Sequence, residues 1–198
     1  MVRNIVFDFG KVLVDFDFKS FVSTIIEDGE EQSEFLSVVC NDEFVALCDK
    51  GDTSFPELVR GLQEEYPQWV GYLQEFHDRQ LDAITSEIPG MRSLIERLRR
   101  EGYGVYGLSN WSEVVYDVIE KFDILKMLDG RLISSEEKLI KPDPAIYRRF
   151  CEKFSLKPEE CLFTDDKAIN VEGAKKAGMQ AVLFTGAEAL EEYIHSLR

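Results

Sequence analysis

Several side chains that can do chemistry stand at or directly after the ends of short apolar segments. They are a pair of neighbouring acids, one further acid, a hydroxyl and an amide: Asp165 and Asp166, Asp8, Ser109, and Asn110. Lys141, followed by a proline, lies a little after another apolar segment. If these segments are parallel strands, their carboxyl ends meet at one edge of a sheet, where ligands bind in open α/β structures. The sequence therefore predicts that these groups share one site.

This set of groups suits phosphoryl transfer. An aspartate such as Asp8 can attack phosphorus and form an aspartyl-phosphate, which divides one difficult step into two easier ones. Carboxylates that face one another need a hard cation such as Mg²⁺, which also screens the nucleophile from the phosphate charge. A lysine such as Lys141 and a hydroxyl near a helix N-terminus can hold phosphoryl oxygens and stabilise their charge. We therefore expect a small phosphorylated molecule as substrate and Mg²⁺ as cofactor.

The elements that must position these groups alternate along the chain. Short runs rich in branched and aromatic residues predict buried strands at residues 4–9, 104–108, 131–134, 161–164 and 180–184. Helical periodicity, as in Val114, Val115, Val118 and Ile119, separates the last four of these runs. Alternation of this kind predicts an α/β fold with a Rossmann-like, doubly wound parallel sheet.

About ninety residues between the first two strands show helical patterns and no convincing strand. A single crossover connection needs far fewer residues. We therefore predict an inserted all-helical cap subdomain at residues 16–87 and a core domain formed by residues 1–15 and 88–198, with hinges near residues 15–19 and 85–90.

The same residues carry a resemblance to a known family. Four stretches, in order, resemble the four motifs of the haloacid dehalogenase superfamily: residues 7–15, Leu108-Ser109-Asn110, residues 141–144, and residues 163–166 with Asn170. Each stretch alone is a weak signal, but the ordered set spans nearly the whole chain and is highly specific. The insertion after the first motif resembles the small helical cap of subfamily I, which includes bacterial α-D-glucose-1-phosphate phosphatase.

The resemblance implies a role for each residue. Asp8 is the nucleophile, Lys141 neutralises the phosphoryl oxygens, and Ser109 with the Asn110 backbone binds those oxygens. The implied ligands of Mg²⁺ are the Asp8 carboxylate, the Gly10 carbonyl, Asp166 directly, and Asp165 directly or through water.

Gly10 departs from the family pattern. Phosphatases of this superfamily usually carry a second aspartate two residues after the nucleophile, as the general acid for the leaving group, although the glucose-1-phosphate phosphatase branch looks similar to this chain at that position. A glycine keeps the backbone carbonyl but cannot donate a proton, and a positioned general acid is typically worth ~10²–10⁴-fold in rate. We infer either a good leaving group or an acid supplied from elsewhere, such as the cap. Asp15 and Asp17 lie nearby in sequence, but neither is assigned that role.

Composition limits the partners. The net charge of −15 is spread along the chain, which disfavours nucleic acid and anionic membranes as partners. No apolar run reaches the ~18 residues of a membrane span, and the N-terminus does not resemble a secretory signal. The GxGxxG stretch at residues 102–107 follows a helical pattern and runs into a strand, the reverse of a dinucleotide site. We expect a cytoplasmic monomer or small homo-oligomer.

Three alternatives stay open at this point. A 2-haloacid dehalogenase also uses an aspartate nucleophile but needs no metal, and paired Asp165 and Asp166 argue against it. The chain can also be a phosphate-binding regulatory protein that lost catalysis, or a phosphotransferase that uses another acceptor.

The stretch from Lys50 to Thr53 is either a polar turn or a loop that selects the substrate.

Overall fold

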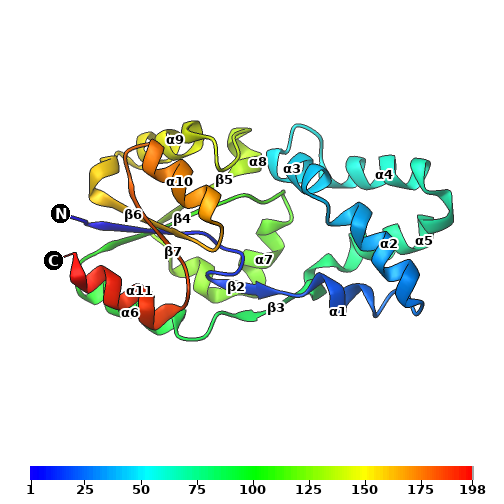
Figure 1. Ribbon diagram of the computed structural model, residues 1–198, viewed down its shortest axis with the longest axis horizontal. Coiled ribbons are helices and arrows are strands. Elements are labelled where there is room, and N and C mark those ends of the chain that lie inside the picture. The colour runs from blue at the N-terminus through cyan, green and yellow to red at the C-terminus, as the bar shows by residue number, and fades with distance from the viewer. Residues whose placement is uncertain (198) are drawn as a thin grey trace.

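A five-stranded parallel sheet forms the centre of the computed structural model, which describes residues 1–197 (Figure 1). The strands lie in the order β5-β4-β1-β6-β7. Their bounds are β1 Asn4–Phe7, β4 Gly104–Ser109, β5 Gly130–Ile133, β6 Cys161–Asp165 and β7 Gln180–Leu183. Each predicted strand is therefore present to within two residues at either end.

Helices cover both faces of this sheet (Figure 1). One face carries α6 Met91–Arg100, α7 Val115–Lys121 and α11 Ala187–Ser196, and the other carries α9 Pro144–Phe154 and α10 Ala168–Lys176. The short helix α8, Ser134–Glu137, directly follows β5. The predicted doubly wound α/β class is confirmed.

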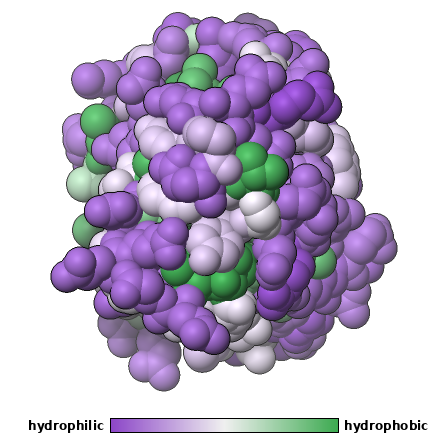
Figure 2. Space-filling view, turned by 90° about the vertical axis from the view of Figure 1, so that its right-hand side faces the viewer, coloured by the Kyte–Doolittle hydropathy of each residue, from purple (hydrophilic) through white to green (hydrophobic). Residues whose placement is uncertain are grey.

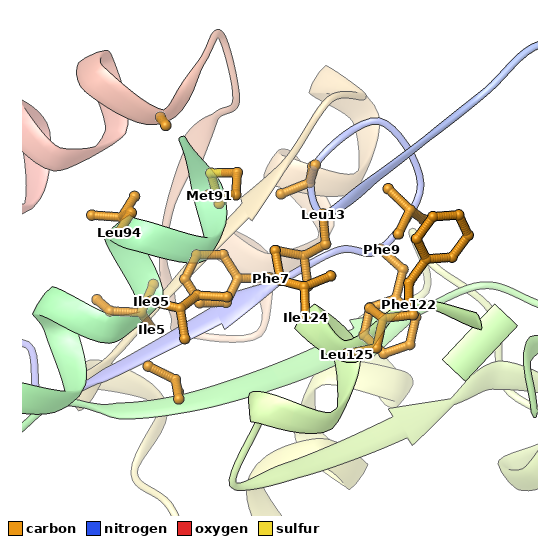
Figure 3. Close-up of a cluster of buried hydrophobic side chains, with 14 of the residues drawn as sticks. Ile5, Phe7, Phe9, Leu13, Met91, Leu94, Ile95, Phe122, Ile124 and Leu125 are labelled. Atoms are coloured by element: carbon orange, nitrogen blue, oxygen red, sulfur yellow. The ribbon is translucent and has the colours of Figure 1, made fainter. Parts of the chain in front are cut away.

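The central strand β1 is buried on both faces because its side chains alternate. Ile5 and Phe7 pack into the hydrophobic core under α6 and α7 (Figure 3), whereas Val6 packs into the second core under α9 and α10. All three side chains are fully buried. Burial of each such side chain stabilises the fold by roughly 1.5–3 kcal/mol, so the end of β1, where Asp8 follows, is firmly held.

Two short strands lie where the sequence predicted none. β2 Val14–Phe16 and β3 Ile84–Glu87 form a separate antiparallel pair, with an irregularity between Asp15 and Phe16. The expectation of an insertion free of strands was therefore wrong at its two borders. Strands of three and four residues are too short for a period-2 pattern, and their partners are about seventy residues apart in sequence.

Between β2 and β3 the chain forms five α-helices, seen on the right of Figure 1. Their bounds are α1 Phe18–Val22, α2 Gly29–Val39, α3 Asp42–Lys50, α4 Phe55–Glu65 and α5 Val70–Arg79. These helices enclose a third hydrophobic cluster that includes Phe35, Leu73 and Phe76. The division at residues 15/16 and 87/88 stays a prediction, and residue 198 lies outside the described part of the chain.

The outer face of the helical layer is mainly hydrophilic, with small separated hydrophobic areas on the side shown in Figure 2. Val45, Leu47 and Val70, which lie in α3 and α5, are exposed apolar side chains. Across residues 1–197, no helix combines the length and apolar character that a bilayer span requires.

Candidate active site

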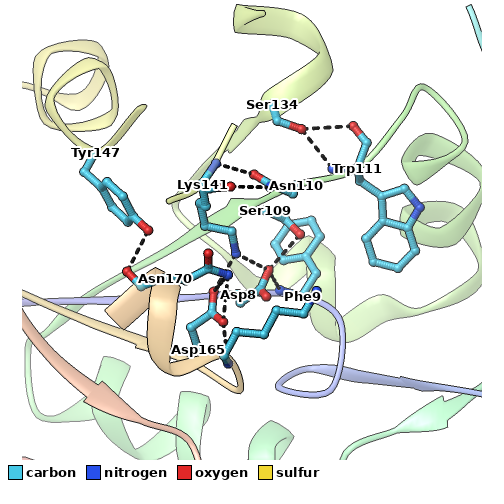
Figure 4. Close-up of polar contacts among 11 residues, drawn as sticks. Asp8, Phe9, Ser109, Asn110, Trp111, Ser134, Lys141, Tyr147, Asp165 and Asn170 are labelled. Atoms are coloured by element: carbon cyan, nitrogen blue, oxygen red, sulfur yellow. Dashed lines mark hydrogen bonds and ion pairs between the residues drawn. The ribbon is translucent and has the colours of Figure 1, made fainter. Parts of the chain in front are cut away.

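The predicted groups meet at the carboxyl edge of the parallel sheet (Figure 4). Asp8 directly follows β1, Ser109 ends β4, and Asp165 ends β6, so three adjacent strands deliver them side by side. Ser109 and Asp165 are fully buried, and Asp8 is buried with 8% of its surface exposed. The order of strands in the sheet, with β1 in the middle, explains why residues more than a hundred positions apart touch.

Lys141 lies between two of these carboxylates. Its Nζ is 2.8 Å from Asp8 Oδ1 and 2.7 Å from Asp165 Oδ2, and its side chain is 1% exposed. Burial alone would lower the pKa of Lys141, but the charges and hydrogen bonds of Asp8 and Asp165 hold it above its ordinary value. Lys141 is therefore a permanent cation inside a strongly acidic protein.

The backbone of Lys141 is fixed by Asn110. The Asn110 side chain donates from Nδ2 to the Lys141 carbonyl at 3.0 Å and accepts from the Lys141 amide at 2.8 Å. Beside this segment, Gly173 of α10 comes so close to Pro142 that an added Cβ would lie 2.4 Å from the Pro142 carbonyl oxygen. The sequence assigned only the Asn110 backbone to the site. Its side-chain role was missed because the partner lies 31 positions away.

The two oxygens of Asp8 differ in their surroundings. Oδ1 lies 2.7 Å from the Phe9 amide and 2.8 Å from Ser109 Oγ, which both donate to it, besides its ion pair with Lys141. Oδ2 accepts no hydrogen bond from residues 1–197. Burial raises the pKa of Asp8 to about 6, although Lys141 opposes the shift. One oxygen is thus held in place while the other is available to a substrate or cation.

Asp8, Asp165 and Asp166 form a group of carboxylates whose oxygens lie within 4.8 Å of one another. Asp165 is fully buried, and Asp166 is exposed. Burial would raise the pKa of Asp165, but Lys141 and hydrogen bonds from Asn170 and the Lys167 amide hold it below the usual range. Asp165 is therefore ionised.

The chemistry of this donor set fits a hard divalent cation. Carboxylate oxygens are the ligands that Mg²⁺ takes in proteins, and the three acids come from two adjacent strands. Asn170 Nδ2 donates to both Asp165 oxygens at 3.0 Å, and the backbone carbonyl of Asn170 accepts from Tyr147 Oη at 2.7 Å. The sequence named Asn170 only as part of a motif, and the structure shows it holding Asp165.

Gly10 lies in the turn that follows Asp8, where it forms an isolated bridge with Val14. A Cβ added at Gly10 would lie 3.0 Å from Cε1 of Phe16. The phenyl ring of Phe16 therefore borders the space that a side chain at position 10 would occupy. The use of the Gly10 carbonyl as a metal ligand stays a prediction.

Comparison with known proteins agrees with this fold. A family model described as haloacid dehalogenase-like hydrolase matches residues 5–184. The chain belongs to the haloacid dehalogenase-like hydrolase family, and the predicted membership and hydrolase class are confirmed. The narrower likeness to glucose-1-phosphate phosphatase stays a prediction.

Several curated relatives are phosphatases by name. D-ribitol-5-phosphate phosphatase of Bacteroides thetaiotaomicron is 26% identical over 198 residues, which cover 91% of this chain and 90% of the relative. Glyceraldehyde 3-phosphate phosphatase of Pyrococcus furiosus is 28% identical over 72% of this chain. The match spans only about three fifths (62%) of the length of that relative. An (S)-2-haloacid dehalogenase of Burkholderia cepacia is 32% identical, over 49% of this chain.

Solved structures share the fold. A haloacid dehalogenase family enzyme of Bacteroides thetaiotaomicron, in complex with magnesium and inorganic phosphate, superimposes with a TM-score of 0.77 at 22% identity and covers 94% of this chain and 96% of its own. A hydrolase of the same family from Porphyromonas gingivalis gives a TM-score of 0.77 at 23% identity over the whole of this chain and 98% of its own.

Proposed function

We propose that this hydrolase is a Mg²⁺-dependent phosphomonoesterase that acts on small phosphorylated metabolites through an aspartyl-phosphate on Asp8. The observation that carries the proposal is the group of carboxylates around Asp8 with the buried Lys141 cation beside it. A phosphoryl group brought to this edge meets a nucleophile, a cation and a hydroxyl donor within one small volume. The phosphatase names of the relatives, and the magnesium and phosphate bound by a structural neighbour, support the same reading.

Each side chain takes one part in the reaction. Asp8 Oδ2, which accepts no hydrogen bond within residues 1–197, attacks phosphorus while Oδ1 stays held by Phe9 and Ser109. Lys141 neutralises charge on the phosphoryl oxygens, and Ser109 Oγ can turn from Asp8 to donate to one of them. Water then hydrolyses the aspartyl-phosphate and restores the carboxylate.

A bound Mg²⁺ would be held by Asp8 and Asp166, with Asp165 directly or through water and the Gly10 carbonyl as a further ligand. The cation supplies charge that reduces repulsion between the nucleophile and the phosphate. Asp165 already accepts bonds from Lys141, Asn170 and the Lys167 amide. Its part is therefore largely to orient Lys141, whereas the exposed Asp166 is the better placed to bind the cation directly.

Removal of the metal tests this proposal. EDTA should abolish the release of phosphate from phosphorylated metabolites, and excess Mg²⁺ should restore it, because three close carboxylates repel an anionic substrate without a cation. A screen of small polyol and aldehyde phosphates, measured as phosphate released with EDTA and with Mg²⁺, checks the expectation.

The second candidate is dehalogenation of 2-haloacids, which the similarity to the Burkholderia cepacia enzyme favours. Halide release that continues in EDTA, together with no phosphatase activity in Mg²⁺, would reverse the order of the two candidates. The cytoplasmic location, the monomer or small homo-oligomer and the absence of nucleic-acid and membrane partners stay predictions.

A further inference from the structure

The leaving group of a phosphomonoester needs a proton, and Gly10 has no side chain to donate it. This question rests on the proposed function, since only a phosphatase has an alkoxide to protonate. A side chain at position 10 would also lie against the ring of Phe16, because an added Cβ would be 3.0 Å from Phe16 Cε1. The acid must come from another element.

The next two acids after Gly10 in the sequence, Asp15 and Asp17, already have partners. Asp15 Oδ1 pairs with Lys11 Nζ at 2.5 Å and accepts from the Phe16 amide, and the bond from Lys11 lowers its pKa. Asp17 caps α1, accepts from the amide and hydroxyl of Ser20, and has a pKa lowered by those bonds. Both are ionised carboxylates at neutral pH and cannot serve as proton donors.

The end of helix α3 is anchored beside the site. Ser134 Oγ donates to the backbone carbonyl of Asp49 and accepts from the Trp111 amide at 3.0 Å. Trp111 directly follows Ser109 and Asn110 in the sequence. Gly51, in the left-handed region at φ 68°, ends the helix, and an added Cβ there would lie 2.6 Å from Ser135 Cβ. Lys138 Nζ also donates to the Gly51 carbonyl. These contacts fix the last turn of α3 against the edge of the sheet that carries the site.

The carboxyl of Asp49 is unpaired in this position. It is half-buried and has no hydrogen bond or ion pair with any of residues 1–197. Charges from three segments of the core act on it: those of Lys141, Lys167 and Asp8. Burial raises the pKa of Asp49 to about 7, with the two lysines opposing the shift and Asp8 adding to it. On its own helix, burial raises the pKa of Cys48 to about 12, so that thiol is neutral.

We infer that Asp49 is the general acid of this enzyme, contributed by helix α3 in place of the side chain that Gly10 lacks. As the Asp8 oxygen bonds to phosphorus, the bond from phosphorus to the ester oxygen breaks, and the Asp49 carboxyl gives its proton to that oxygen. The alcohol leaves, and Asp49 remains as a carboxylate. Water then attacks the aspartyl-phosphate and gives a proton to Asp49, which restores both acids.

The leaving group provides the test. Asp49→Asn keeps the size of the side chain but removes the proton. We expect kcat/KM to fall by about 10²-fold or more on an alkyl monoester, and by less than about 10-fold on p-nitrophenyl phosphate, whose leaving group needs little protonation. The alkyl substrate is D-ribitol 5-phosphate or glyceraldehyde 3-phosphate, whichever the wild-type enzyme hydrolyses faster. Asp42→Asn, at the exposed first residue of the same helix, is the matched control and should change neither value.

The pH profile of the wild-type enzyme gives a second measurement. Because the protonated form donates, kcat/KM on the alkyl substrate should fall as pH rises through about 7, whereas the value on p-nitrophenyl phosphate should not. The inference is overturned if Asp49→Asn lowers kcat/KM equally on both substrates, or if it leaves the ratio of the two kcat/KM values as it is in the wild-type enzyme.

Failure of the inference can be separated from failure of the proposed function. Beryllium fluoride with Mg²⁺, followed as a thermal shift, should stabilise Asp49→Asn as much as the wild-type protein, which shows an intact site. If Asp8→Asn abolishes both activities while Asp49→Asn keeps the wild-type ratio, Asp49 is not the acid and the phosphatase stands. If Asp8→Asn keeps full activity, the proposed function itself is wrong, and the assignment of Asp49 falls with it.

Discussion

Replacing Asp8 with asparagine should lower phosphatase turnover by about 10⁴-fold or more. The amide is nearly the same size as the carboxylate and can still accept from Ser109 and Phe9 through its oxygen, so the local structure should survive. It carries no negative charge to attack phosphorus, and loss of a covalent nucleophile is among the costliest single changes in an enzyme. Phosphate release from p-nitrophenyl phosphate in excess Mg²⁺ measures the effect.

The same acid-to-amide change at Asp42, on the surface of α3, is the control and should leave turnover within about twofold of wild type, as surface changes usually do. Wild-type turnover in Asp8→Asn would show that another group attacks phosphorus. Phosphate release by the wild-type protein that is lost in Asp8→Asn would exclude a purely regulatory site, and tight binding of beryllium fluoride to the wild-type protein would support a competent one.

Replacing Lys141 with methionine should damage both stability and activity. Two carboxylates, Asp8 and Asp165, would lose the cation that lies 2.8 and 2.7 Å from them. Removing one partner of a buried ion pair typically costs about 3–5 kcal/mol, which corresponds to a melting temperature lower by roughly 6–20 °C in a protein of this size. Phosphate release should also fall by about 10²-fold or more, because no other buried cation faces the phosphoryl oxygens within residues 1–197.

Unfolding in EDTA and in Mg²⁺ gives this prediction a second readout. Mg²⁺ should raise the melting temperature of Lys141→Met by more than that of the wild-type protein, because the divalent ion then replaces the missing charge. In EDTA the stability lost should be smaller at pH 5 than at pH 8. Asp8, whose pKa is about 6 even beside the lysine, binds a proton at the lower pH and no longer needs a cation.

Lys175→Met is the control for this substitution, since Lys175 is exposed and pairs only with Glu172 among residues 1–197. Its melting temperature should match that of the wild-type protein within about 2 °C, as expected for an exposed ion pair. An unchanged melting temperature of Lys141→Met in EDTA would mean that Asp8 and Asp165 are not held as charged partners of the lysine.

The sequence could predict the site because its groups stand at strand ends. Asp8 follows a strand, and Ser109 and Asp165 each end one; the apolar character of these strands is local information, and the rule for parallel sheets then brings the three residues together. The sequence could not predict the hydrogen bonds that hold these site residues in place. The side chain of Asn110 serves the backbone of Lys141, and the partner of a polar side chain is decided by tertiary packing.

The helical insertion shows the same limit. The helical pattern of the insertion includes Phe44, Leu47 and Cys48, which all lie in helix α3, but Leu47 is 49% exposed. Periodicity places side chains on one face of a helix without fixing which neighbour that face meets. For this reason Asp49 could not be recognised from sequence: its importance comes from the hydrogen bond between its carbonyl and Ser134, and from the charges of Lys141, Lys167 and Asp8 on other segments.

The antiparallel pair of β2 and β3 has a mechanical consequence. Both passages of the chain between the sheet and the five helices run through these two paired strands, so a rigid rotation of the helices pivots there and must also break the bonds of the α3 end to Ser134 and Lys138. Displacement in a rotation grows with distance from its axis. The tips of α4 and α5, at the far end of the molecule in Figure 1, would sweep the widest arc, whereas Asp8, six positions before β2, would hardly move. Molecules of different size could then enter without disturbing the nucleophile.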